Sequence, residues 1–272
     1  MAPEAVFSTL YKIALLLEYE GTNYAGFQIQ PHQPTIQGEL ERALARLTGE
    51  AVRVFPASRT DAGTHAWGQV ISFSTEKPHS LEAFVRGVNF YLPSDIRVQV
   101  SYWVASSFDP RRDAYAREYH YRMLRRPAPS ALLKRYVHHV SRHLDLEGMR
   151  ECANWLIGRR DFAPFSSEQR NVSTIRELNR LDLVENGDFL TMEVEGSAFL
   201  AQQIRRTAGA LLEVGMGRLE VKAFQQMADS GQRGIAGPTL PANGLYLVKV
   251  LYKDFPPREG MLPSGTLPTN KK

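Results

Sequence analysis

Residues 57–68 read ASRTDAGTHAWG and lie just before an apolar stretch, Val70–Phe73, that is typical of a β-strand. Within this loop, Arg59 and Asp61 stand two residues apart, and Gly63 allows the backbone to approach a ligand closely. The same letters also fit an ordinary turn, because Asp followed by Ala-Gly is common turn chemistry. The sequence therefore predicts a loop that presents one charged carboxylate, Asp61, and leaves open whether that carboxylate is catalytic.

Outward from the loop, the first half of the chain alternates strand and helix patterns. Thr35 predicts the start of a helix and Gly49 its end, with apolar residues at helical spacing between them. A polar stretch around residues 106–113 then predicts a linker. Besides that helix, we expect a helix at Leu81–Phe90 and strands at Tyr11–Tyr19, Val52–Phe55, Val70–Phe73 and Arg97–Val104.

The second half has a similar mixture of strand and helix patterns. Residues 185–188, ENGD, are a hairpin turn signal. We expect strands at Ala116–Leu124, Leu178–Val184, Phe189–Val194 and Tyr246–Tyr252, helices at Leu146–Ile157, Phe199–Val214 and Val221–Ala228, and a loop at Arg159–Phe162. This pattern predicts an α+β fold of two similar halves, 1–108 and 109–255, with mixed, mainly antiparallel sheets. Residues 256–272 contain few apolar side chains, so we expect a disordered tail.

Composition narrows the classes of function. The single cysteine, Cys152, excludes an intramolecular disulfide and a cysteine-rich zinc cluster, which favours the cytoplasm. No stretch is apolar for long enough to span a bilayer. The 33 basic residues are mostly arginine and the pI is about 9.2, which suits a polyanionic partner such as RNA. A genome rich in arginine codons would explain the same bias equally well.

The motifs of several enzyme classes are missing. The sequence has no GxxxxGK[ST], no GxGxxG after a strand, no HExxH and no paired CxxC, so nucleotide hydrolysis, dinucleotide redox chemistry and zinc chemistry lack their usual scaffolds. His138 and His139 are adjacent, and in a strand they point to opposite faces. We therefore predict no metal site and no cofactor.

Residues 116–123, AREYHYRM, alternate as a strand does. Arg117, Tyr119 and Tyr121 share one face, which would offer aromatic rings for stacking beside a cation. Stacking of a base on such a ring is worth about 1 to 3 kcal/mol. Packing between strands explains the same pattern, because tyrosine is common in sheets.

The predicted helix from Phe199 carries an arginine in an unusual place. Arg205 lies among small or apolar neighbours such as Ala201, Ala208 and Leu212, which indicates a packed face. An unpaired buried guanidinium is costly, so we expect a carboxylate nearby. A structural ion pair would satisfy this expectation as well as a catalytic one.

Taken together, these stretches resemble the TruA family of tRNA pseudouridine synthases from Tyr11 to Tyr252. Six blocks carry the resemblance: YEGTNYAGFQIQ at 19–30, RTDAGTHA at 59–66, AREYHYRM at 116–123, GRRDFAPF at 158–165, FLAQQIRRTAGALLEVGMG at 199–217 and GPTLPANGLYLVKV at 237–250. Four positions depart from the usual family pattern: Glu20 replaces Asp, Phe27 replaces Trp, Ser58 replaces Gly and Asn243 replaces a frequent His.

The resemblance implies a role for five residues. Asp61 is the catalytic aspartate, Tyr119 stacks on the target uracil, and Arg205 pairs with the aspartate. Arg59 helps to insert or hold the flipped nucleotide, and Leu245 contributes to substrate binding. It also implies a central catalytic cleft between the two halves, no metal and no cofactor, and a cytoplasmic homodimer that acts on the three uridine positions that the family modifies in the anticodon stem-loop of tRNA.

Two other functions stay open at this point. One is a catalytically silent RNA-binding or tRNA-folding protein on the same scaffold. The other is a carboxylate enzyme that acts on a small phosphorylated molecule, and it would show activity without RNA.

Overall fold

The computed structural model describes residues 10–77, 79–167 and 173–256. The strands are β1 (Tyr11–Tyr19), β2 (Phe55–Pro56), β3 (His65–Thr75), β4 (Ile96–Trp103), β5 (Ala114–Arg125), β6 (His138–Val140), β7 (Gly158–Asp161), β8 (Ile175–Asn186), β9 (Phe189–Gly196) and β10 (Leu245–Tyr252). The helices are α1 (Ile36–Thr48), α2 (Leu81–Tyr91), α3 (Leu146–Trp155), α4 (Gln203–Gly215) and α5 (Val221–Ala228). The predicted tail lies outside the described residues from 257 onward.

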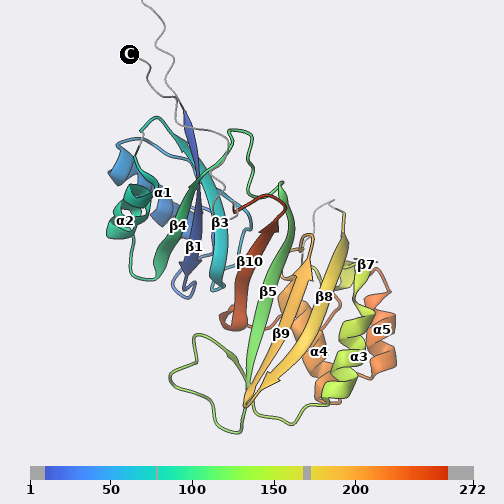
Figure 1. Ribbon diagram of the computed structural model, residues 1–272. Helices are drawn as coiled ribbons and strands as arrows, with labels where there is room; N and C mark the ends of the chain where they lie inside the picture. Colours follow the sequence, from blue (N-terminus) through green and yellow to red (C-terminus); the bar gives the residue numbers. More distant parts are fainter. Residues whose placement is uncertain (1–9, 78, 168–172, 257–272) are drawn as a thin grey trace, which may run out of the picture.

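All ten of these strands belong to one sheet. Its order is β4-β1-β3-β10-β5-β9-β8-β7, with β2 on β3 and β6 on β5 (Figure 1). The pairs are antiparallel except β10 with β3 and β5 with β6. The predicted α+β class with mainly antiparallel strands is therefore confirmed, and the strands of both halves join in one continuous sheet. The division after residue 108 stays a prediction.

The last strand of the chain joins the two halves. β10 lies between β3 of the first half and β5 of the second (Figure 1). It pairs with β3 only through His65 and Ala66, the first two residues after the loop that carries Asp61. That loop therefore lies where the two halves meet.

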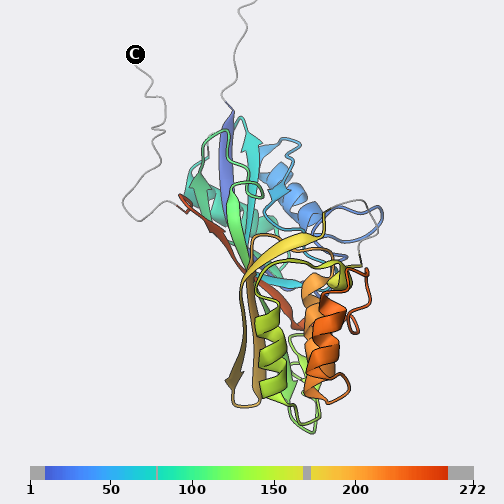
Figure 2. The same cartoon turned by 90° about the vertical axis from the view of Figure 1, so that its right-hand side faces the viewer.

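The five helices lie on one side of the sheet, α1 and α2 behind the first half and α3, α4 and α5 behind the second (Figures 1 and 2). The predicted limits of α1 are confirmed: Thr35 accepts a hydrogen bond from the Gly38 amide, and Gly49 is left-handed with φ 74°. Among the described residues, no helix has both the length and the apolar character needed to cross a membrane.

Several predicted elements differ from the structure. The loop predicted at residues 57–68 ends at Thr64, because residues 65–68 already belong to β3. Val52–Val54 is not a strand, because the Val54 backbone bonds the side chains of Gln37 and Glu41 on α1. The predicted loop at Arg159–Phe162 is wrong over its first three residues, which extend the sheet as edge strand β7 beside β8.

The helix predicted from Phe199 begins four residues later, at Gln203. Gln202 has a left-handed backbone with φ 59°, which interrupts the helical path. The non-helical segment before it places the Phe199 ring 5.3 Å from the Tyr119 ring, edge to face. The later start therefore brings this segment to the site described next.

Candidate active site

The Asp61 loop rests on the segment that follows β1. The Phe27 amide donates to the Thr60 carbonyl at 3.0 Å, and the Gly63 amide donates to the Tyr24 carbonyl at 3.3 Å. At Gly26, φ is 98° and an added Cβ would lie 2.8 Å from the Thr60 carbonyl oxygen. Two blocks that are separate in the sequence thus form one unit around Asp61.

Buried polar side chains hold the loop from the sheet side. The Gln69 amide group is fully buried, donates to the Ser58 carbonyl at 2.8 Å and accepts from the Ser58 amide at 3.2 Å. Tyr19 shares a 2.8 Å hydrogen bond with the Thr60 hydroxyl. Because these contacts fix the residues just before Asp61, the carboxylate projects from a rigid support.

Asp61 pairs with Arg205 on α4. The Asp61 Oδ2 atom lies 3.5 Å from Arg205 Nη1, and the Arg205 Nε atom donates to the Leu240 carbonyl at 2.6 Å. The predicted carboxylate beside Arg205 is therefore present. Burial raises the pKa of the Asp61 carboxyl above 3.8, and the charge and hydrogen bond of Arg205 offset part of that rise. The Asp61 side chain is 35% exposed, so it stays open to a ligand.

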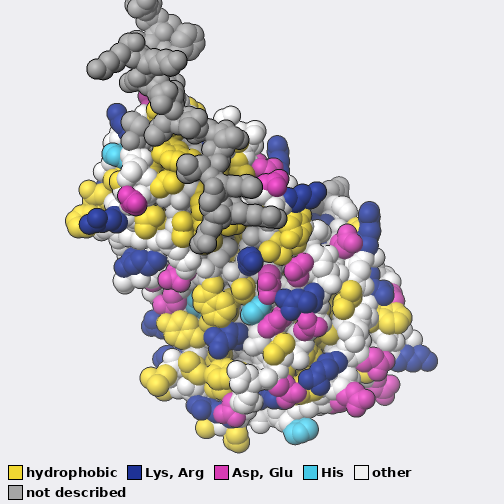
Figure 3. Space-filling view, in the orientation of Figure 1, with side chains coloured by type: hydrophobic (Ala, Val, Ile, Leu, Met, Phe, Trp, Pro, Cys, Tyr) yellow, Lys and Arg dark blue, Asp and Glu magenta, His cyan; other side chains and the backbone are white. Residues whose placement is uncertain are grey.

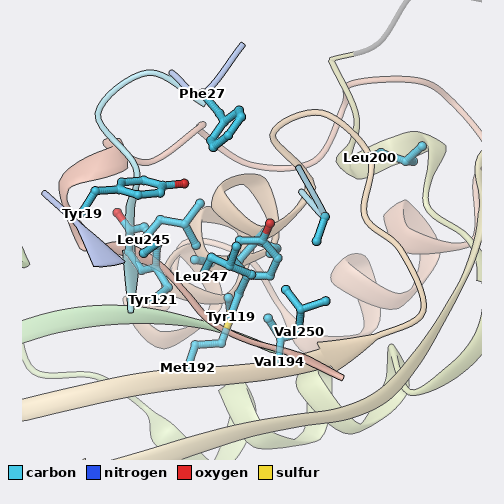
Figure 4. Packing of buried hydrophobic residues seen from close by; sticks show 14 of the residues in the cluster. Tyr19, Phe27, Tyr119, Tyr121, Met192, Val194, Leu200, Leu245, Leu247 and Val250 are labelled. Carbon is cyan, nitrogen blue, oxygen red and sulfur yellow. The ribbon is translucent and has the colours of Figure 1, made fainter. Parts of the chain in front are cut away.

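Tyr119 presents its hydroxyl to the loop. It is 6% exposed, and its hydroxyl lies 2.6 Å from Ser58 Oγ. Figure 4 shows its ring among apolar side chains, with the hydroxyl pointing away from Met192 and Val194. Burial raises the pKa of Tyr119 to about 12, so the hydroxyl keeps its proton at neutral pH.

The other two residues on this face of β5 have structural contacts. Arg117 donates to the carbonyls of Ala57, Arg111, Ala114 and Ser197 at 2.5 to 3.3 Å, which ties the loop to the second half. Tyr121 is fully buried and donates to the Pro241 carbonyl at 2.8 Å. Of the two tyrosines predicted for stacking, only Tyr119 reaches the cavity.

A cavity of about 440 Å³ lies between the loop, β5 and the start of α4. Its lining includes all five residues predicted for the site: Arg59, Asp61, Tyr119, Arg205 and Leu245. Arg59 is exposed and makes no hydrogen bond or ion pair with any other residue that the structure describes. The cavity thus combines a carboxylate, an aromatic ring, an apolar side chain and a free cation.

One group of metal-ligating type occurs among the described residues, on the opposite face of the sheet. Glu118, His120 and Glu193 have ligand atoms within 4.8 Å of one another. Arg180 already bonds Glu118 at 2.9 Å and Glu193 at 2.8 Å. The face in Figure 3 shows the same character, with acidic and basic side chains interspersed. This group is an ion-pair network in which Arg180 supplies the cation.

The sequence is similar to those of known tRNA pseudouridine synthases. The sequence profile described as tRNA pseudouridine synthase matches residues 15–109 and 152–253. The chain is 42% identical over 257 residues to tRNA pseudouridine synthase A of Myxococcus xanthus, covering 94% of this chain and 96% of that protein. It is 42% identical over 241 residues to tRNA pseudouridine synthase A of Geobacter sulfurreducens, covering 88% of this chain and 99% of that protein.

These sequence matches define a pseudouridine synthase, an isomerase that rearranges a nucleotide already present in RNA. The chain belongs to the tRNA pseudouridine synthase family. The predicted family is therefore confirmed.

Ser58 and Gln69 were not predicted as residues of the site, and Arg117, predicted as the cation beside the stacking rings, holds the loop instead. Ser58 was noted only as a departure from the family pattern, yet its hydroxyl bonds Tyr119. Gln69 and Arg117 hold the loop. Each is a polar residue at a strand position that is buried. A search for strand positions that are polar but face the core would have found both.

Proposed function

We propose that this protein isomerises uridine to pseudouridine in the anticodon arm of tRNA, with Asp61 as the catalytic carboxylate. We further propose that it acts in the cytoplasm, as a homodimer and without a cofactor. The observation that carries the catalytic assignment is the meeting of Asp61, Arg205 and Tyr119 on one cavity. Membership of the tRNA pseudouridine synthase family supports the substrate class.

The target uridine has to leave the RNA stack before it can react. Extrusion costs a few kcal/mol, and stacking on an aromatic ring returns about 1 to 3 kcal/mol per base. Tyr119 supplies that ring in the cavity, and Leu245 adds apolar contact. Arg59 at the same cavity has a guanidinium free to bond the backbone phosphate of the extruded nucleotide.

The reaction breaks the bond between N1 of uracil and C1′ of the ribose, turns the base, and joins C5 to C1′. The proton that leaves C5 balances the one that N1 gains, so the rearrangement needs no oxidant and no reductant. Three roles suit ionised Asp61: attack on C1′, attack on C6, or removal of the ribose 2′ proton. Arg205 favours the charged carboxylate in each case. The neutral Tyr119 hydroxyl would take up the C5 proton as it passes its own proton to the Ser58 hydroxyl.

The charge distribution supports a polyanionic substrate. The pI is about 9.2, and Arg59, Arg111, Arg117 and Arg205 line the cavity. On the opposite face of the sheet, acidic side chains alternate with basic ones (Figure 3). We infer that RNA approaches from the side of the sheet that carries the helices and the cavity.

The experiment maps pseudouridine in tRNA before and after incubation with the purified protein. We expect new pseudouridine in the anticodon arm with the wild-type chain and none with Asp61→Asn, because the amide keeps the shape and loses the charge. The Asn variant should bind tRNA within a few-fold of wild type. Turnover by this variant at a hundredth of the wild-type rate or more would contradict the role of Asp61. A small phosphorylated molecule consumed without RNA would contradict the substrate class.

A further inference from the structure

A second cavity of about 470 Å³ adjoins the catalytic one. Asp61, Arg205 and Arg59 line both cavities, whereas Tyr119 lines only the first and Gln28 only the second. The two cavities therefore share the Asp61–Arg205 pair as a wall, and a group bound in the second would lie next to a group bound in the first.

The polar side chains of the second cavity have unused hydrogen-bonding capacity. The Gln28 carboxamide bonds no other residue that the structure describes, and it is exposed. The Gln202 carboxamide also lines this cavity, and its oxygen accepts from the Thr239 hydroxyl at a long 3.5 Å. Its NH2 group donates to none of the described residues. Each carboxamide thus has a donor directed to no protein partner.

The backbone at Gln202 adds to this picture. Its φ is 59°, in the left-handed region that residues other than glycine rarely adopt. Backbone strain of this kind costs on the order of 1 to 3 kcal/mol and is concentrated at sites of function. The residue with this backbone conformation, Gln202, comes directly before α4, and its side chain lines both cavities.

We propose that the second cavity binds the nucleotide next to the target uridine, with the carboxamides of Gln28 and Gln202 bonded to the edge of its base. The proposal rests on the function proposed above, since a neighbouring nucleotide exists only if the substrate is a polynucleotide. A carboxamide offers a donor and an acceptor side by side, which matches the edges of nucleobases in single-stranded RNA. Arg59, which lines both cavities, then meets the phosphate that links the two nucleotides.

Phe27 gives this subsite a feature of its own. It lines the second cavity and is fully buried, so it forms an apolar part of the wall next to Gln28. The second cavity therefore selects the neighbouring base, whereas the first cavity binds the reacting base.

The test measures affinity separately from turnover. In Asp61→Asn protein, filter binding compares an anticodon stem-loop RNA that has all its bases with RNAs in which the nucleotide on either side of the target uridine is abasic. At one of the two sides, we expect the missing base to weaken binding at least about fivefold, as for loss of a bidentate base contact. Adding Gln28→Ala should weaken binding of the intact RNA and bring the ratio of the two affinities close to one.

Gln33→Ala is the matched control, because Gln33 is an exposed glutamine of the same segment that lines neither cavity, and it should keep the full ratio. The subsite would be overturned if Gln28→Ala left the ratio of the affinities for intact and abasic RNA unchanged. Equal binding of the intact and both abasic RNAs by the protein that keeps Gln28 would overturn it too. Failure of the proposed function is a different result: no pseudouridine formed by the protein with Asp61 intact.

Discussion

The Tyr119 hydroxyl lies 2.6 Å from Ser58 Oγ, and this hydrogen bond joins the centre of β5 to the loop that carries Asp61. Glycine in place of Ser58 would have no side chain to make the bond. Gln69 bonds both the amide and the carbonyl of Ser58, so the main chain that carries this hydroxyl has a fixed position. The orientation of the Tyr119 hydroxyl is therefore set partly by Ser58, a residue of the Asp61 loop.

Ser58→Gly should slow the reaction and leave tRNA affinity nearly unchanged. The change removes the hydrogen bond and leaves the buried Tyr119 hydroxyl without its partner, which costs about 1 kcal/mol and corresponds to roughly a fivefold loss of rate. Single-turnover rates and filter binding separate the two effects. Ser58→Thr keeps a hydroxyl and should recover most of the rate. A Gly variant as fast as wild type would show that the bond does not matter for the reaction.

Arg205→Met should move the acid limb of the pH–rate profile to higher pH. Asp61 has to be ionised to act, so activity falls as the pH drops through its pKa. Burial already raises this pKa above 3.8, and Arg205 opposes the rise. Without the guanidinium the pKa of Asp61 rises further, because the positive charge that opposes the effect of burial is gone. Arg205→Lys keeps a positive charge and should hold the limb near its wild-type position. A limb at the same or lower pH in the Met variant would contradict the role of the ion pair.

Gly21→Ala should destabilise the Asp61 loop. A Cβ at Gly21 would lie 1.9 Å from the carbonyl oxygen of Thr64, a backbone atom that has no flexible end to move. We expect a loss of about 1 to 3 kcal/mol in the free energy of unfolding and a fall in the single-turnover rate, because the loop has to shift. Gly187→Ala is the control. Its φ is 57° and no atom lies within 4 Å of the added Cβ, so it should lose some stability and keep its rate. If Gly21→Ala keeps its rate too, the loop tolerates the shift.

Local patterns predicted most of the elements and the centre of the site. The cap at Thr35, the stop at Gly49 and the alternation of Arg117, Tyr119 and Tyr121 are short-range signals, and the structure follows them. The packed position of Arg205 also predicted a nearby carboxylate. These features depend on residues close together in the chain or on the cost of burying one charge.

Features that depend on distant contacts were not predictable in this way. The central place of β10 follows from pairing with two strands far away in the sequence. Val52–Val54 has an apolar pattern suited to a strand, but its backbone finds partners on α1 instead. The roles of Ser58 and Gln69 appear only when β3, β5 and the loop are placed together. The identity of a residue predicts which chemical groups it offers, whereas tertiary contacts decide which other residue those groups bond.

Tyr119→Phe should separate the two roles proposed for this residue. The ring remains, so stacking worth about 1 to 3 kcal/mol per base is kept and tRNA should bind almost normally. The hydroxyl is lost. Burial raises its pKa to about 12, so in the wild-type protein it holds a proton at neutral pH and takes up the C5 proton only as it passes its own to the Ser58 hydroxyl. Loss of a general acid–base group typically slows a reaction by about a hundredfold or more, and product formation should stall after the glycosidic bond is broken. Tyr119→Ala should lose both affinity and rate. Single-turnover rates and filter binding on the two variants decide between the roles, and a Phe variant with the wild-type rate would leave stacking as the only function of Tyr119.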